Sequence, residues 1–152
     1  MQITKYTDYA LRVLLFLGQN QGKRITIDDI TRHYHISRNH LMKIVHNLSL
    51  AGFIISTRGR SGGLMLAAAP ESITIADVVR TTEKNMALVE CFASGSTCTI
   101  ESDCVVKYIF YRAQDSFMDV LALFTLADIL DRQNLLAARQ PTNIELPISF
   151  HL

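Results

Sequence analysis

The stretch that decides the fold is HISRNHLMKIVHNLSLAGFIISTRGRSGGLMLA, residues 35–67. Its first half predicts an amphipathic helix, because apolar residues recur at steps of three and four along one face. These residues are Leu41, Ile44, Val45 and Leu48. Ser37 is suited to cap the start of this helix, and Gly52 stands where a helix commonly ends. The opposite face is polar and basic.

The second half of the stretch predicts a β-hairpin. Residues 53–57 and 64–67 have the composition of strands, and the glycines between them suit a turn. Arg58 and Arg60 are expected at the tip of this hairpin. An amphipathic helix that follows a short helix and a turn predicts a helix-turn-helix, and the basic hairpin after it predicts a winged helix.

Other helices flank this stretch. They are predicted at residues 7–22, 26–34, 74–85, 105–124 and 126–134. Their expected N-caps are Thr7, Thr26, Thr74 and Thr125, with Asp29, Asp77 and Asp128 as capping-box partners. The fold class is therefore mainly α with a small β-hairpin. Residues 1–69 are expected to form a winged helix-turn-helix domain, and residues 70–138 a linker helix, a cysteine loop and dimerisation helices. The sequence assigns no role to residues 139–152.

Charge is distributed unevenly along the chain, although the formal net charge is only +1. Residues 1–70 carry nine lysines and arginines against three acidic residues, whereas residues 71–152 carry six against eleven. A basic first half favours an anionic partner for the winged helix.

Double-stranded DNA is the partner that these features predict. The N-terminal residues of a recognition helix reach base edges in the major groove, and arginine and asparagine there suit guanine and adenine. Lysine suits a phosphate, and arginines on a glycine-rich tip suit the backbone or a minor groove. The candidate DNA-binding residues are Ser37, Arg38, Asn39, His40, Lys43, Arg58 and Arg60.

The predicted helix at residues 105–124 carries an apolar stripe over a length of about 30 Å. So long a stripe in a small protein favours pairing with a second copy, and a two-fold homodimer matches a palindromic operator. No apolar run is long enough for a bilayer span and no signal peptide is evident, so the expected location is cytoplasmic, without a membrane partner.

Three cysteines, Cys91, Cys98 and Cys104, occur in the pattern C-x6-C-x5-C. This spacing lacks the short paired knuckles of structural zinc sites, and an odd count does not favour disulfides. The segment holds no histidine base for thiol catalysis, and the chain shows no nucleophile–base pair, so an enzyme is not expected. Soft thiolates on a loose loop suit an iron–sulfur cluster but fall one ligand short of four. Inert thiols remain an alternative.

Several motifs together resemble the Rrf family of iron–sulfur winged-helix repressors. They are TDYALRVLLFL, SRNHLMKIVHNLSLAGFI, RGRSGGLMLA, ITIADVVR, the three-cysteine loop and TLADIL, in this order from residue 1 to about 135. Within the family the chain is most similar to the nitric-oxide-sensitive repressors. The cluster-biogenesis regulators place a histidine three residues after the last cysteine, where this chain has Lys107.

The resemblance implies a [4Fe-4S] or [2Fe-2S] cluster that senses nitric oxide and whose damage releases DNA. It also implies that the three cysteines of one subunit are joined by Asp8 of the partner subunit as the fourth ligand. Glu90, Glu101 and Asp103 are rival oxygen ligands nearer in sequence. The alternative function is a DNA-binding regulator that uses the cysteines as a cluster-free thiol or zinc switch.

Overall fold

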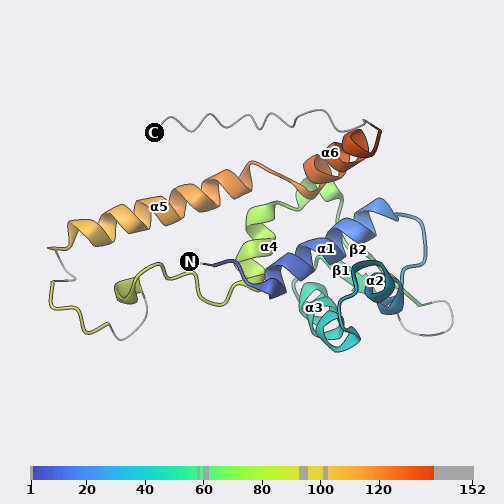
Figure 1. The fold of residues 1–152 in the computed structure, drawn as a ribbon, viewed down its shortest axis with the longest axis horizontal. Coiled ribbons are helices and arrows are strands. Elements are labelled where there is room, and N and C mark those ends of the chain that lie inside the picture. Colours follow the sequence, from blue (N-terminus) through green and yellow to red (C-terminus); the bar gives the residue numbers. More distant parts are fainter. Residues whose placement is uncertain (1, 58, 60–61, 93–95, 101–102, 139–152) are drawn as a thin grey trace.

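The computed structural model describes residues 2–57, 59, 62–92, 96–100 and 103–138, and side chains up to residue 132 (Figure 1). Its helices are α1 (Lys5–Gln19), α2 (Ile27–Tyr34), α3 (Arg38–Leu50), α4 (Ile75–Thr82), α5 (Val105–Ala122) and α6 (Leu126–Ala138). Two single-turn 3-10 helices, η1 and η2, span Pro70–Ser72 and Glu90–Phe92, and two strands, β1 and β2, span Ile54–Ser56 and Leu64–Leu66. The predicted fold class, mainly helical with one small hairpin, is confirmed.

The helix-turn-helix consists of α2 and α3, and both helices begin as their sequences predict. The Thr26 side chain accepts a hydrogen bond from the Asp29 backbone while the Asp29 side chain accepts one from the Thr26 backbone, which completes a capping box. The Ser37 side chain accepts from the His40 backbone at the start of α3. Between the helices, His35 adopts a left-handed conformation with φ 55°, and this residue turns the chain from α2 into α3.

The wing is an antiparallel hairpin of β1 and β2 with Ile54 opposite Leu66 and Ser56 opposite Leu64. Ile54 and Leu64 are buried, so one face of the hairpin closes the core. Ile25, just before α2, adds a bridge beside Leu64. The wing is therefore attached through β2 to the residue that precedes the helix-turn-helix (Figure 1).

Helix α1 begins one turn earlier than the sequence predicts. Its N-cap is Thr4, not Thr7, and the Thr7 backbone donates to the Thr4 hydroxyl over 3.4 Å. Thr7 is fully buried inside the helix. The prediction of Thr7 as the cap is therefore wrong, and the reason is tertiary, because the Thr7 hydroxyl bonds to residues at the end of α4.

One core joins the winged helix to later parts of the chain. Leu14, Leu41 and Leu48 lie in the same buried cluster as Leu126 and Leu130 of α6. Helix α6 packs along α1, and its start is capped by Thr125 and Asp128 as predicted. Residues 1–69 thus share their core with the C-terminal helix, and α4 and α6 brace α1 from the side away from α3 (Figure 1).

Helix α5 extends away from this body (Figure 1). Met118, near its C-terminal end, is its only buried residue in the described part of the chain, and it packs against Ile75 and Val79 of α4. The rest of α5 is largely exposed and apolar. Among the residues that the structure describes, no helix has the length and hydrophobicity to span a membrane.

Candidate nucleic-acid interface and cysteine segment

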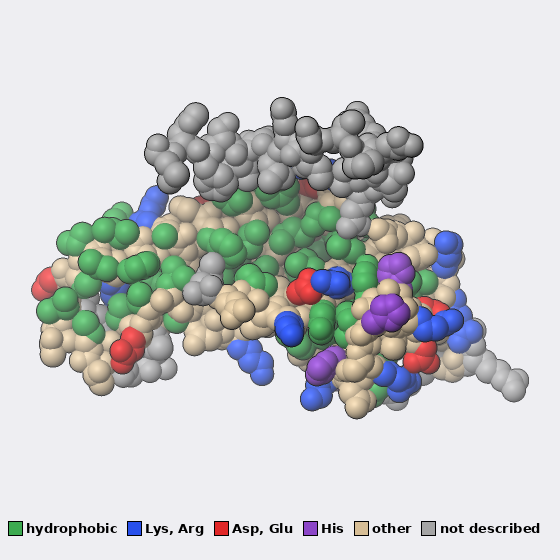
Figure 2. Space-filling model, viewed as in Figure 1, with side chains coloured by type: hydrophobic (Ala, Val, Ile, Leu, Met, Phe, Trp, Pro, Cys, Tyr) green, Lys and Arg blue, Asp and Glu red, His purple; other side chains and the backbone are tan. Residues whose placement is uncertain are grey.

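The polar side of α3 faces solvent. The sequence predicts Ser37, Arg38, Asn39, His40 and Lys43 as DNA contacts, and all five are exposed. The opposite side of the helix is buried in the core, so its outward side is fixed by packing. Figure 2 shows histidine and basic side chains gathered over the helix-turn-helix, whereas apolar side chains cover α5.

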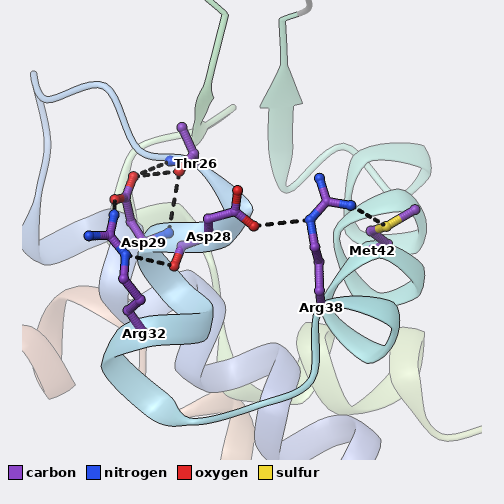
Figure 3. Close-up of polar contacts among 6 residues, drawn as sticks. All are labelled: Thr26, Asp28, Asp29, Arg32, Arg38 and Met42. Atoms are coloured by element: carbon purple, nitrogen blue, oxygen red, sulfur yellow. Dashed lines mark hydrogen bonds and ion pairs between the residues drawn. The ribbon is translucent and has the colours of Figure 1, made fainter.

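One edge of α3 is held by α2. The Arg38 Nε donates to Asp28 Oδ1 over 3.0 Å, and Arg38 Nη1 lies 3.5 Å from the Met42 sulfur (Figure 3). The neighbouring Asp29 is engaged separately by Thr26 and Arg32. Hydrogen bonds from Thr26 lower the pKa of Asp29, so this carboxylate stays ionised at the start of α2. Arg38 therefore meets solvent as one half of an ion pair.

The other edge of α3 is held by α1. The Asn47 Nδ2 donates to the Tyr6 hydroxyl over 2.7 Å, and that hydroxyl lies 3.5 Å from the backbone oxygen of Lys43, to which it donates. A groove beside this contact is lined by Tyr6, Lys43, His46, Asn47 and, from the chain after α4, Lys84. No local sequence pattern pairs Tyr6 with α3.

The base of the wing is fixed by hydrogen bonds to the backbone oxygens of Gly62 and Gly63. The Thr57 N–H donates to the Gly63 oxygen over 2.9 Å, and Arg24 Nε donates to the Gly62 oxygen over 2.6 Å. A Cβ atom on Gly63 would lie 3.0 Å from the backbone oxygen of Ile25, so this position favours glycine. The predicted contacts Arg58 and Arg60 lie outside the described residues.

The cysteine segment runs between α4 and α5. Cys91 lies in η2 and is half-buried, Cys98 is exposed, and Cys104 is half-buried at the N-cap of α5. The Lys107 N–H donates to the Cys104 sulfur over 3.4 Å. Near Cys91, the Phe92 ring meets the Tyr111 ring edge-on at 6.4 Å, which places η2 beside α5.

The three thiols are not gathered into a ligand set. Within the described portion of this single chain, no group of three or more His, Cys, Asp or Glu residues could hold a metal ion. Asp8 instead pairs with Arg12, whose Nε lies 3.0 and 3.1 Å from its two carboxylate oxygens. The bond to Asp8 raises the pKa of Arg12. Of the rival ligands, Glu90 and Asp103 are exposed, and Glu101 lies outside the described residues.

The donor chemistry of this segment nevertheless fits an iron–sulfur cluster. All three thiols are free of disulfides, and none is fully buried. The Cys104 sulfur lies at the N-terminus of α5, where it accepts the hydrogen bond from the Lys107 N–H. Thiolates at accessible positions on a loop are the ligands that iron–sulfur clusters use.

A polar cluster that the sequence does not predict joins α1 to the end of α4. Glu83, which follows α4, accepts hydrogen bonds from the Thr4 N–H over 2.8 Å, from the Thr4 hydroxyl over 2.9 Å and from the Thr7 hydroxyl. The Thr7 hydroxyl also lies 2.7 Å from that of Thr82. Desolvation pushes the pKa of Glu83 up, but the hydrogen bonds from Thr7 and Thr4 outweigh it and leave the pKa lowered. Tyr6, the residue before Thr7, accepts the hydrogen bond from Asn47 of α3.

Comparison with known proteins agrees with this arrangement. The model of the Rrf2 family, described as an iron-dependent transcriptional regulator, matches residues 3–132. The HTH-type transcriptional regulator NsrR of Geobacillus kaustophilus is 47% identical over 133 residues, which cover 86% of this chain and 90% of that protein. The NsrR of Bacillus subtilis is 42% identical over 132 residues, 86% of this chain and 90% of that protein.

The solved structures include a protein described as a transcriptional regulator from Listeria innocua. It has a TM-score of 0.72 and 28% identity, and the match covers 100% of this chain and 96% of that one. These relatives are named as regulators, which confirms the prediction that the chain is not an enzyme. With a family model matching most of its length and relatives above 40% identity, the chain belongs to the Rrf2 family of transcriptional regulators.

Proposed function

We propose that the protein is a dimeric repressor that binds a palindromic operator and releases it when an iron–sulfur cluster is damaged by nitric oxide. The observation that carries the DNA-binding part is the fixed, outward presentation of α3. Asp28 and Tyr6 hold its two edges, while Arg38, Asn39 and Lys43 face solvent.

In this proposal residues 1–69 read the DNA. Arg38 pairs with guanine and Asn39 with adenine in the major groove, and Lys43 takes a phosphate. Ser37 and His40 add polar contacts at the start of the helix, where Ser37 also serves as its cap. Arg58 and Arg60 of the wing tip take the backbone or the minor groove.

Residues 70–138 form the dimer and hold the cluster. The dimer is supported by the surface of α5, which leaves large apolar side chains exposed in a single chain. These are Val105, Val106, Tyr108, Ile109, Phe110, Tyr111 and Val120. So large an apolar surface marks an interaction site. A two-fold pair through α5 presents two copies of α3, and they fit half-sites about 34 Å apart or a multiple of that distance.

The residues proposed to hold the cluster are Cys91, Cys98, Cys104 and Asp8 of the partner subunit. When bound, the cluster supplies iron that reacts with nitric oxide. Asp8 has a competing partner in Arg12 of its own chain, and this ion pair would compete with ligation. A carboxylate that moved from Arg12 to the cluster would link the two subunits only in the cluster-bound state. That link would favour one of two arrangements of the dimer interface.

The action is proposed for the cytoplasm, because free thiols stay reduced there and DNA is accessible. The test is iron and sulfide analysis of protein purified without oxygen, combined with DNA binding before and after addition of nitric oxide. Coloured protein that contains iron and sulfide and loses its DNA on treatment supports the proposal. Colourless protein that contains zinc, or no metal, and still switches would show the alternative thiol or zinc mechanism.

Single substitutions separate the proposed ligands and contacts. Asp8→Ala is expected to alter the visible spectrum, and Glu90→Ala and Asp103→Ala serve as comparison variants, because each is a rival oxygen ligand. A spectrum that changes only with a rival would move the fourth ligand to that residue. Arg60→Ala is expected to lower the salt dependence of DNA binding by about one unit, because it removes one phosphate contact.

A further inference from the structure

We infer that Asp28 is a specificity-positioning residue, which orients the Arg38 guanidinium so that it reads a guanine rather than a phosphate. The inference rests on the proposed DNA-binding function. Asp28 itself is not needed to pair with a base, and no local sequence pattern links it to Arg38.

The geometry supports this role. Asp28 Oδ1 lies 3.0 Å from Arg38 Nε, and Met42 lies on the other side, with its sulfur 3.5 Å from Arg38 Nη1 (Figure 3). The guanidinium is thus held between a carboxylate from α2 and a thioether one turn further along α3. A flexible arginine that is already oriented loses less conformational freedom when it binds. Its remaining N–H groups are left for a partner outside the protein.

The exposure of the pair argues against a role in folding. The side chains of Arg38 and Asp28 are 60% and 64% exposed, and ion pairs this exposed add little to stability. The cap of α2 is completed by Thr26 with the neighbouring Asp29, not with Asp28. Within the described residues, the hydrogen bonds and ion pairs of the Asp28 carboxylate lead to Arg38.

The charge of Asp28 gives the inference its distinctive consequence. A carboxylate next to the DNA-facing side of α3 repels phosphates, so it lowers affinity for every DNA sequence. It also draws the Arg38 charge away from the backbone, while a held arginine still pairs bidentately with guanine O6 and N7. Asp28 therefore exchanges general affinity for discrimination between bases.

The experiment measures DNA binding by fluorescence anisotropy with full-length, anaerobically purified protein. The probe is the duplex that the wild-type protein selects from a randomised pool. It is compared with single-base variants of that duplex and with an unrelated duplex of equal length. The proteins are wild type, Asp28→Asn, Arg38→Ala and the double variant, with Asp131→Asn on α6 as a control that removes the same charge from an exposed site.

Arg38→Ala first identifies the guanine that Arg38 reads. Asp28→Asn is then expected to bind the unrelated duplex as tightly as wild type or more tightly. It is expected to lose about three- to tenfold discrimination at that guanine, a part of the effect of one bidentate contact. In the Arg38→Ala background Asp28→Asn should cause no further loss of discrimination, and Asp131→Asn should leave discrimination unchanged.

Two results would overturn the inference. If Asp28→Asn tightens binding to all duplexes equally, Asp28 is only a repulsive charge. If it weakens binding to all duplexes equally and lowers the melting temperature, Asp28 only supports α2. A wild-type protein that selects no sequence from the pool contradicts the proposed function itself, and that result is distinct from both.

Discussion

Replacing Glu83 tests whether the polar cluster of Glu83, Thr4, Thr7 and Thr82 holds α1 to the end of α4. Glu83→Ala removes one part-buried hydrogen bond from Thr7 and two exposed ones from Thr4. Hydrogen bonds to a charged group contribute about 1.5–3 kcal/mol where they are partly buried and less where they are exposed, so the expected loss of unfolding free energy is about 2–3 kcal/mol. Thr7 keeps a partner in Thr82, so no hydroxyl is left unpaired in the core.

The assay is urea unfolding followed by circular dichroism at one protein concentration, because the stability of the proposed dimer depends on concentration. A loss of this size lowers the melting temperature by about 5–10 °C for a chain of this length. Glu71→Gln, an exposed glutamate in η1, is the control and should change stability by less than about 0.5 kcal/mol. A double-mutant cycle with Thr7→Val should give a coupling of about 1 kcal/mol.

The dependence on pH gives a second readout of the same cluster. The pKa of Glu83 is lower in the folded chain than in the unfolded one. Its stabilisation is therefore fully present above the unfolded-chain pKa of about 4.3 and is lost as the pH falls through the folded-state pKa. The difference between wild type and Glu83→Gln should shrink over this range. A Glu83→Ala variant as stable as the Glu71→Gln control, with no change in this difference with pH, would refute the reasoning.

Three further predictions concern α6, α3 and α5. Leu126→Ala, at a fully buried site, should lower the unfolding free energy by about 2–5 kcal/mol in urea titrations. Leu123→Ala, at a residue 75% exposed, should have little effect. Equal effects would show that α6 is not part of the core. Tyr6→Phe should cost about 1 kcal/mol of stability and weaken DNA binding, because Asn47 loses its partner, and anisotropy that matches wild type would contradict this. Ile109→Glu should convert the proposed dimer to monomer in sedimentation experiments, and an unchanged mass would exclude this part of α5 from the interface.

Helix starts were predictable because their hydrogen bonds are local. Thr26 bonds to Asp29 and Thr125 to Asp128, each three residues away, so the pattern is visible in a short window of sequence. The same capping rule fails for Thr7. It precedes an apolar stretch as a cap does, yet its hydroxyl bonds to Thr82 and Glu83, 75 and 76 residues away.

The candidate contacts on α3 were predictable for a similar reason, since helical periodicity alone places Asn39 and Lys43 opposite the buried face. The sequence presents Arg38 as a residue available to DNA, and the structure adds its ion pair with Asp28, ten residues earlier. The cysteines are conspicuous in the sequence, but the described part of one chain does not gather them. A site that needs a partner subunit or a bound cluster for its geometry cannot be completed by the folding of one chain.

The sequence by itself determined which segments are helical, which face of α3 is polar and where the three thiols stand, because each depends on residues within a few positions of one another. Only the tertiary structure decided how those parts are held. It joins Glu83 to the start of α1, Tyr6 to Asn47 and α6 to the core of the winged helix. Tyr6 and Asn47 are 41 positions apart in the sequence, and Thr4 and Glu83 are 79 positions apart. Such contacts depend on the packing of the whole chain, which brings these residues together from distant parts of the sequence.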